Sequence, residues 1–221
     1  MTAPPRAPVP LAEVSAPVWP GRSADGEIEV LEEVLVWHNP IARLFEDRVR
    51  YPAHDGGDET EARNFRLVPA QDQEEGVVIA PIDEHGRLLL VRQFRHPVRR
   101  WMIECPRGAR ERGESPEEAA ARELREETGA DATAFLPLGR LAPDSGQLGS
   151  VVWLLAARVR RAGPRAPEDT EAIDRVVPMA YAALRSACER GEILDAFTLA
   201  VVLRLAPYAG GDALALPWST A

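Results

Sequence analysis

The chain of 221 residues contains no lysine, so all 26 of its basic side chains are arginines. Cysteine is nearly absent too: Cys105 and Cys188 lie far apart without metal-ligand spacing, which excludes a disulfide framework. No apolar run approaches the length of a membrane span, and the proline-rich N-terminus lacks the apolar segment of a signal peptide. We therefore expect a cytoplasmic protein that does not associate with membranes.

Positive charge is in the minority, with 35 acidic against 26 basic residues and a net charge of -9. This balance argues against general nucleic-acid binding, which requires a basic surface. It would also repel a phosphate-rich substrate unless local arginines and bound cations reverse the field. The hydrophobic fraction of 45% is normal for a folded domain.

The chain divides by composition into three parts. Residues 1–24 are rich in alanine, proline and valine and predict a flexible tail. Residues 25–72 predict a small antiparallel β arm with strands at 28–37, 44–51 and 64–68. An arm with so little core should dock on another surface, and we expect a homodimer formed through it.

Residues 73–221 predict one mixed α+β domain. A β-hairpin is expected at 76–82 and 87–94, and a loop after Gly108. Further strands are expected at 101–104, 135–141, 151–159 and 173–178, and further helices at 180–190 and 196–205.

The clearest helix begins after Ser115, where Pro116 and Glu118 complete a capping-box pattern, and it ends at Gly129. Its three glutamates Glu123, Glu126 and Glu127 have i, i+3, i+4 spacing and therefore share one side. The pattern alone is typical of a solvated acidic face relieved by Arg122 and Arg125. The alternative is that a divalent cation neutralises the cluster, since Mg²⁺ prefers carboxylate oxygens.

The surrounding residues favour the second interpretation. Gly108 precedes Glu114 by five intervening residues, and seven more separate Glu114 from the segment 122–130, which reads RELREETGA. This pattern resembles the Nudix box at each defining position. If each of seven fixed residues matches by chance about one time in ten, all seven match with a probability of roughly one in ten million per start position.

The resemblance implies a Nudix-type α/β/α sandwich around a mixed sheet, and it implies roles for individual residues. Glu123, Glu126 and Glu127 are expected to bind Mg²⁺ or Mn²⁺, with the carbonyl of Arg107 as an extra ligand. Arg122 is expected to orient these carboxylates, Gly108 to let the loop backbone approach the metal, and Glu114 to support the loop.

Three further segments, 91–95, 104–108 and 191–198, are similar to the ADP-ribose pyrophosphatase and nucleoside-diphosphate-sugar branch of this family. That branch implies hydrolysis of a diphosphate linkage to a nucleoside monophosphate and a sugar phosphate. Arg92 or Arg95 is expected to hold a substrate phosphate, with surface ion pairs as the alternative. Glu104 is expected to contact substrate or a nearby water, with a structural salt bridge as the alternative.

Members of the branch often supply a catalytic glutamate from a loop before a late strand. Here this implies Glu171, with Glu168 and Asp169 in reserve, against the alternative of a solvated acidic loop. The branch also uses an aromatic residue of its arm to stack on the base. The candidates are Trp37, Phe45 and Phe65, each of which is otherwise explained as core.

One departure concerns the substrate. Many ADP-ribose hydrolases carry Ser-Pro-Gly and then an acidic residue after the box, whereas residues 142–150 keep Pro143 and Gly146 without a following glutamate. Nucleoside-diphosphate sugars other than ADP-ribose therefore remain candidate substrates. The alternatives are a hydrolase of nucleoside triphosphates or dinucleoside polyphosphates, and a non-catalytic Nudix-fold binding module. The first is disfavoured by the arm, and the second by the complete set of box carboxylates.

Overall fold

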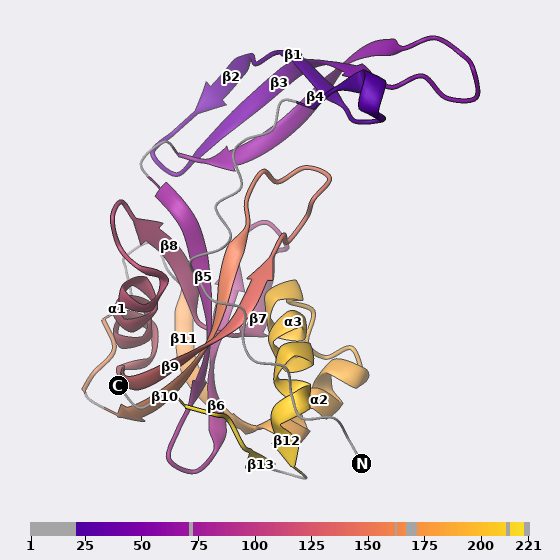
Figure 1. The fold of residues 1–221 in the computed structure, drawn as a ribbon. Helices are drawn as coiled ribbons and strands as arrows, with labels where there is room; N and C mark the ends of the chain where they lie inside the picture. Colours follow the sequence, from indigo (N-terminus) through magenta and orange to yellow (C-terminus); the bar gives the residue numbers. More distant parts are fainter. Residues whose placement is uncertain (1–20, 71–72, 162, 167–171, 211–212, 219–221) are drawn as a thin grey trace. The chain divides into compact units, whose positions relative to one another are not determined.

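The computed structural model describes residues 21–70, 73–161, 163–166, 172–210 and 213–218. The chain divides into two compact units, which are described separately (Figure 1). Among the described residues, the main unit contains those from 75 to 141 and from 151 onward, and the arm unit contains those from 21 to 74 together with residues 142–150.

The main unit is built on a mixed sheet. Its strand order is β11-β6-β5-β10-β9, with β7 added to β6 and β8 added to β5. β10 runs parallel to β5, whereas β9, β7 and β11 pair antiparallel with their neighbours. The strands are β5 (Gln73–Ile82), β6 (Arg87–Arg95), β7 (Arg100–Glu104), β8 (Arg107–Glu111), β9 (Ala130–Leu141), β10 (Val152–Arg161) and β11 (Ile173–Ala180).

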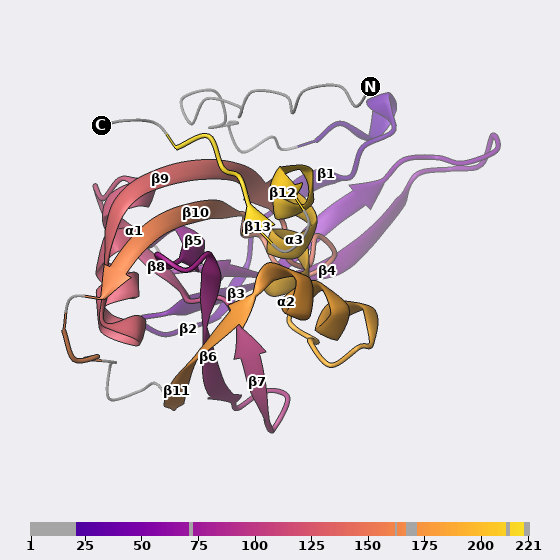
Figure 2. The same ribbon diagram turned by 90° about the horizontal axis from the view of Figure 1, so that it is seen from below.

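Helices cover both faces of this sheet. α1 (Pro116–Thr128) lies on one face, and α2 (Tyr181–Glu189) and α3 (Ala196–Leu205) lie on the other (Figures 1 and 2). A hydrophobic core fills the space between the sheet and the helix pair α2–α3, with Leu88, Leu90, Leu154, Leu184 and Val201 fully buried in it. The expected α/β/α sandwich around a mixed sheet is thereby confirmed.

The remaining elements of the main unit are short. A 3-10 turn η3 (Ala206–Tyr208) leads into the two-residue strands β12 (Ala209–Gly210) and β13 (Ala213–Leu214). In the described part of the chain, no helix is long and apolar enough to cross a membrane.

The prediction of a loop after Gly108 is wrong, because β8 (Arg107–Glu111) is a strand. Its residues, RGARE, have no apolar alternation, so the strand is specified by backbone pairing with β5 rather than by its side chains. A Cβ on Gly76 would lie 2.9 Å from the carbonyl oxygen of Gly108, so glycine at position 76 permits this close approach. β9 also begins at Ala130, directly after the helix rather than at residue 135.

The arm unit is a four-stranded antiparallel sheet preceded by the 3-10 turn η2 (Ser23–Asp25). β3 (Ala42–Tyr51) is central, with β4 (Thr60–Pro69) on one edge and both β1 (Glu29–Glu32) and β2 (Leu35–His38) on the other. The single strand predicted at 28–37 is therefore wrong. The strand is interrupted at Glu33 and Val34, and each half also has a register irregularity, at Val30/Glu32 in β1 and at Leu35/Trp37 in β2.

The borders of the arm differ in two ways from the predicted division of the chain. Residues 1–20 of the expected tail lie outside the described residues, while Ser23 belongs to η2 and is only 8% exposed. The segment 142–150 belongs to the arm unit rather than to the sandwich. The amide of Leu67 donates to the carbonyl of Gln147, and the amide of Gly149 donates to that of Leu67, each at 2.9 Å.

Candidate active site

The helix α1 is delimited by strong local signals at both ends. The Ser115 hydroxyl accepts a hydrogen bond from the amide of Glu118 at 3.2 Å, and the Glu118 carboxylate accepts one from the amide of Ser115 at 2.8 Å. Gly129 closes the helix with φ of 70°, and a Cβ there would lie 2.4 Å from the carbonyl oxygen of Gly163. The predicted capping box and glycine stop are both present.

The three box glutamates differ in burial. Glu127 is 1% exposed and Glu123 is 7% exposed, so both carboxylates are almost completely withdrawn from solvent. Glu126, in contrast, has 31% of its side chain exposed. A solvated acidic face would show three exposed carboxylates, whereas burying ionised groups is costly unless they are compensated. This part of α1 is therefore a specialised site rather than an ordinary polar helix face.

Arg122 connects the helix carboxylates to the preceding loop. Its Nη1 donates to Glu123 at 2.7 Å and to Glu126 at 3.3 Å, while its Nε donates to Glu114 at 3.1 Å. Its Nη2 also donates to the Ala109 carbonyl at 2.8 Å. The hydrogen bond to Glu114 is the main reason that the pKa of Arg122 is raised above its ordinary value, with burial opposing the shift and Glu123 adding to it.

The same contact acts on Glu114. The hydrogen bond from Arg122 is the main cause that lowers the pKa of the Glu114 carboxyl, which therefore stays ionised near neutral pH. Glu114 also accepts a hydrogen bond from the Glu111 amide at 2.9 Å. These contacts are consistent with the predicted roles, in which Glu114 supports the loop and Arg122 orients the box carboxylates.

Gly108 lies directly against the Glu123 carboxylate. A Cβ on Gly108 would meet Glu123 Oε1 at 1.9 Å and Cδ at 2.0 Å, a separation that no real side chain can adopt. Any side chain at position 108 would therefore displace the Glu123 carboxylate from its observed position.

Gly108→Ala is expected to push the Glu123 carboxylate aside and to lower activity by about 10²-fold, the usual cost of misplacing a catalytic group by about 1 Å. Steady-state kinetics with the substrate class that the sequence resemblance implies measure the effect. The matched control is Gly210→Ala, where an added Cβ has no atom of the described residues within 4 Å. Equal activity of the two variants would contradict the packing argument.

A second charged cluster surrounds Glu104, which has no exposed surface. Arg95 donates two hydrogen bonds to the Glu104 carboxylate, from Nε at 3.0 Å and from Nη2 at 2.9 Å. Arg107 Nη2 lies 2.7 Å from the same carboxylate. Arg107 also donates to Asp195 at 2.9 Å. Glu104 is thus held in salt bridges, and its side chain is not open to solvent.

The Glu104 cluster is linked electrostatically to the box. Burial alone would lower the pKa of Arg95, but the hydrogen bond to Glu104 and the negative charges of Glu104, Glu127 and Asp195 raise it. Arg95 therefore carries its positive charge within the field of the buried box glutamate.

Arg92 and Arg95, the two candidate phosphate ligands, are not brought together. They are three positions apart in the regular strand β6, so their side chains point to opposite faces of the sheet. Arg92 donates to Asp174 at 2.7 Å and lies over the Trp101 ring at 4.2 Å. Only Arg95 is on the side of Glu104 and the box helix.

The candidate bases Glu168, Asp169 and Glu171 lie outside the described residues. The residues that flank them are described. On one side the amide of Ala166 donates to the carbonyl of Glu126 at 3.0 Å, and on the other the amide of Phe94 donates to the carbonyl of Ala172 at 3.0 Å. Five residues therefore connect a contact with the box helix to a contact with β6.

The candidate aromatics all belong to the arm unit. Trp37 is 51% exposed and Phe65 is 57% exposed, so neither is core. Phe45 is partly buried, with the Arg66 guanidinium 4.2 Å from its ring centre.

The box residues suit a hard divalent cation. No three His, Cys, Asp or Glu side chains form a complete cage within the described ranges. Mg²⁺ does not require one, since it keeps several waters and usually binds one or two carboxylates together with substrate phosphates. The carboxylates on α1 are hard oxygen donors. Because Gly108 has no side chain, none from that position stands between a cation and the Glu123 carboxylate.

Comparison with known proteins identifies the family. The NUDIX domain model matches residues 72–197, more than half of the chain, and this chain belongs to the Nudix family. It is a Nudix hydrolase with the complete box described above.

The relatives specify the branch. The chain is 32% identical over 203 residues to the ADP-ribose pyrophosphatase of Mycobacterium tuberculosis, covering 89% of this chain and 92% of that protein. It is 45% identical to the Bacillus subtilis ADP-ribose pyrophosphatase over 53 residues, which are only 24% of this chain and 29% of that protein. The predicted likeness to the ADP-ribose pyrophosphatase branch is confirmed.

A solved structure of an "ADP compounds hydrolase" has the same fold. The TM-score is 0.66 at 19% sequence identity, and the match covers 81% of this chain and 92% of that chain. At this identity the likeness extends to the fold alone.

Sequence reasoning missed two members of the Glu104 cluster. The side chain of Arg107 joins Glu104 to Asp195, whereas only its backbone carbonyl was considered. Asp195 caps α3 by accepting from the Thr198 amide at 2.9 Å, and an aspartate three residues before a threonine at a helix start is a recognisable cap. No sequence pattern indicates that Asp195 pairs with Arg107, which is 88 positions away.

Proposed function

We propose that this Nudix hydrolase cleaves the diphosphate linkage of ADP-ribose or a related nucleoside-diphosphate sugar, with Mg²⁺ or Mn²⁺ as cofactor. The products are a nucleoside monophosphate and a sugar phosphate. The observation that carries the proposal is the pair of buried carboxylates, Glu123 and Glu127, with Glu123 fixed between Arg122 and the backbone of Gly108. The names of the relatives support the substrate class.

Glu123, Glu126 and Glu127 would hold the cation, and the carbonyl of Arg107 is a further candidate. When bound, a divalent cation supplies charge neutralisation on phosphoryl oxygens and lowers the pKa of water. The residues of the chain prepare the geometry. Arg122 fixes Glu123 and Glu126 relative to the loop that contains Ala109 and Glu114, which reduces the reorganisation needed when substrate binds.

Arg95 is the better candidate for a substrate phosphate, because it shares the side of the box helix whereas Arg92 does not. Two of its nitrogens are committed to Glu104, which holds the guanidinium plane in one orientation. Within the described residues its Nη1 makes no hydrogen bond and remains to bind an anion. In this proposal Glu104 is a positioning residue that acts through Arg95.

The proton of the attacking water would be accepted by Glu171, or by Glu168 or Asp169 from the same segment. This is supported by the two flanking contacts, from Ala166 to the box residue Glu126 and from Ala172 to Phe94 beside Arg95.

A panel of ADP-ribose, other nucleoside-diphosphate sugars, nucleoside triphosphates and dinucleoside polyphosphates tests the proposal, with Mg²⁺ and Mn²⁺ in parallel. We expect the highest kcat/KM for a nucleoside-diphosphate sugar, and release of two phosphate monoesters. Preference for a triphosphate, or no turnover of any member with either metal, would refute it.

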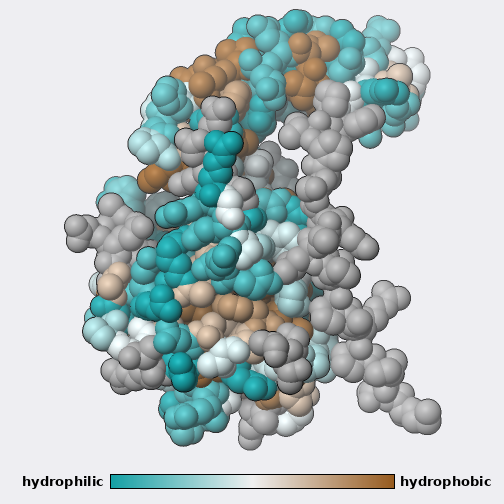
Figure 3. Space-filling model, turned by 60° about the vertical axis from the view of Figure 1, so that its left-hand side comes forward, coloured by the Kyte–Doolittle hydropathy of each residue, from teal (hydrophilic) through white to brown (hydrophobic). Residues whose placement is uncertain are grey.

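We also propose a homodimer formed through the arm unit. Trp37, Leu44 and Leu67 face one another across β2, β3 and β4, and Phe65 lies on the same face because it is two positions from Leu67. Trp37, Phe65 and Leu67 are between 37% and 57% exposed, and Figure 3 shows hydrophobic side chains gathered over this unit. Such an apolar sheet face is typical of a contact surface.

Light scattering should therefore give about 48 kDa, twice the chain mass of 24.2 kDa. Phe65→Glu should shift the protein to 24.2 kDa, because a charge would be buried in the contact. Leu203→Glu, at an apolar side chain of α3 that is 72% exposed, is the control and should leave the mass unchanged. A wild-type monomer at micromolar concentration would rule out the dimer.

A further inference from the structure

A cavity of about 490 Å³ lies in the main unit, beyond the C-terminal end of α1. It is bounded by the turn between β5 and β6, the C-terminal end of β10, the middle of β11, and the segment 163–165. Its lining, all of it described, includes Thr128 and Ala130 but none of Glu104, Gly108, Glu123, Glu126 and Glu127. It is therefore separate from the box carboxylates, and its volume is within the range of small-molecule sites.

The walls of the cavity are rich in positive charge. Arg87, Arg160, Arg165 and Arg175 line it, against the two acids Asp83 and Glu84. In a chain with a net charge of -9, four arginines around one cavity are a local reversal of sign.

Two of these arginines already contact a carboxylate. Arg87 donates to Asp83 at 2.8 and 2.9 Å, and Arg175 donates to Asp174 at 2.8 Å. Glu84, the other acid, has 81% of its side chain exposed and makes only a weak contact with His85 at 3.6 Å.

Arg160 and Arg165 are different, since neither contacts a carboxylate within the described part of the chain. Arg165 uses Nη2 to donate to the carbonyl of Asp174 at 3.1 Å, but its Nη1 is buried and has no hydrogen-bond partner among the described residues. A buried guanidinium nitrogen without an acceptor is costly, and a bound anion would remove that cost.

The remaining walls are apolar. Leu89, Val159, Val176 and Pro178 contribute hydrophobic surface from β6, β10 and β11. The cavity thus combines a cationic part with an apolar part, which suits a ligand that has an anionic group at one end and a flat or apolar group at the other.

We propose that this cavity is a second binding site, for an organic phosphate whose phosphate pairs with Arg160 and Arg165 and whose remainder lies on the apolar wall. Two guanidinium groups match the charge of a phosphate monoester, which is about -1.5 to -2 at neutral pH. The site is independent of the proposed hydrolysis, because none of its lining residues takes part in it.

The test titrates AMP into the full-length protein in EDTA, so that neither turnover nor metal-dependent binding contributes. We expect saturable binding with Kd on the order of 1 mM or tighter. Adenosine, which lacks the phosphate, should bind at least about tenfold more weakly, and inorganic phosphate should compete with AMP. Methyl NMR should show the largest shifts at Leu89, Val159 and Val176.

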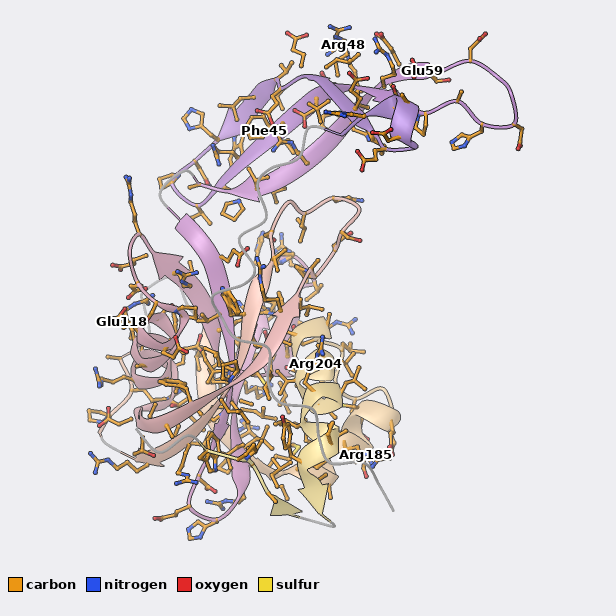
Figure 4. The ribbon with its side chains drawn as sticks, viewed as in Figure 1. Phe45, Arg48, Glu59, Glu118, Arg185 and Arg204 are labelled. Carbon is orange, nitrogen blue, oxygen red and sulfur yellow. The ribbon has the colours of Figure 1, made fainter. Side chains whose placement is uncertain are left out.

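Arg160→Gln/Arg165→Gln should weaken AMP binding at least about tenfold. The matched control is Arg185→Gln/Arg204→Gln, which removes the same charge from α2 and α3 on the opposite side of the sheet from α1 (Figure 4). Both double variants should keep the wild-type hydrolase activity. Absence of AMP binding to the wild type, equal affinity in the two double variants, or methyl shifts centred on Leu124 of the box helix would each overturn the proposal.

Discussion

Glu127→Gln is expected to lower turnover by on the order of 10³-fold while the protein stays folded. The substitution removes one charge from the proposed cation site, and several kcal/mol of charge stabilisation correspond to a factor of this size. Stability should be unchanged or slightly higher. The carboxylate is 1% exposed, so its neutral replacement avoids a desolvation cost and relieves repulsion from Glu123.

Activity assays and thermal unfolding measure the two effects separately. Glu117→Gln is the matched control, because it removes the same charge from the first turn of the same helix. It should retain activity within about twofold, as a surface substitution outside the site does. Full activity of the Glu127→Gln variant would refute the proposed cation site. An unfolded variant would mean that Glu127 has a structural role instead.

Glu104→Gln is expected to destabilise the protein by about 3 kcal/mol, because it leaves Arg95 and Arg107 paired with a neutral group in a buried position. For a chain of this size the unfolding midpoint should fall by roughly 6–12 °C. Activity measured below that midpoint should also fall, since Arg95 loses the partner that fixes its orientation.

The control for this variant is Glu189→Gln, which breaks the exposed pair with Arg185 on α2. Exposed pairs of this kind contribute little, so its midpoint should not move measurably. If Glu104→Gln melted at the wild-type temperature, the buried cluster would not stabilise the fold. Loss of activity in that case would point to direct substrate contact by Glu104, the other possibility raised by the sequence.

Local sequence patterns predicted those features of the site that are set by residues close together in the sequence. The capping residues Ser115 and Glu118, the stop at Gly129 and the shared side of Glu123 and Glu127 all follow from spacing within one helix. The burial of these glutamates did not follow, because it depends on the sheet against which α1 packs.

Long-range pairing accounts for what the sequence did not show. Arg107 joins Glu104 to Asp195 only because β7, β8 and the start of α3 come together in the fold. β8 has no alternating side-chain pattern, and its existence depends on the backbone of β5. The opposite directions of Arg92 and Arg95, in contrast, were available from strand periodicity, because positions three apart in a strand never share a face.

Hydrolysis of ADP-ribose in ¹⁸O-labelled water tests the central claim most directly. In the proposed mechanism the box glutamates and Arg95 act on the phosphate groups of the substrate, and water attacks phosphorus. Mass spectrometry should therefore find the label on the phosphate of AMP or of ribose phosphate. Label on the 5-hydroxyl of free ribose, with unlabelled ADP as the other product, would contradict attack at phosphorus.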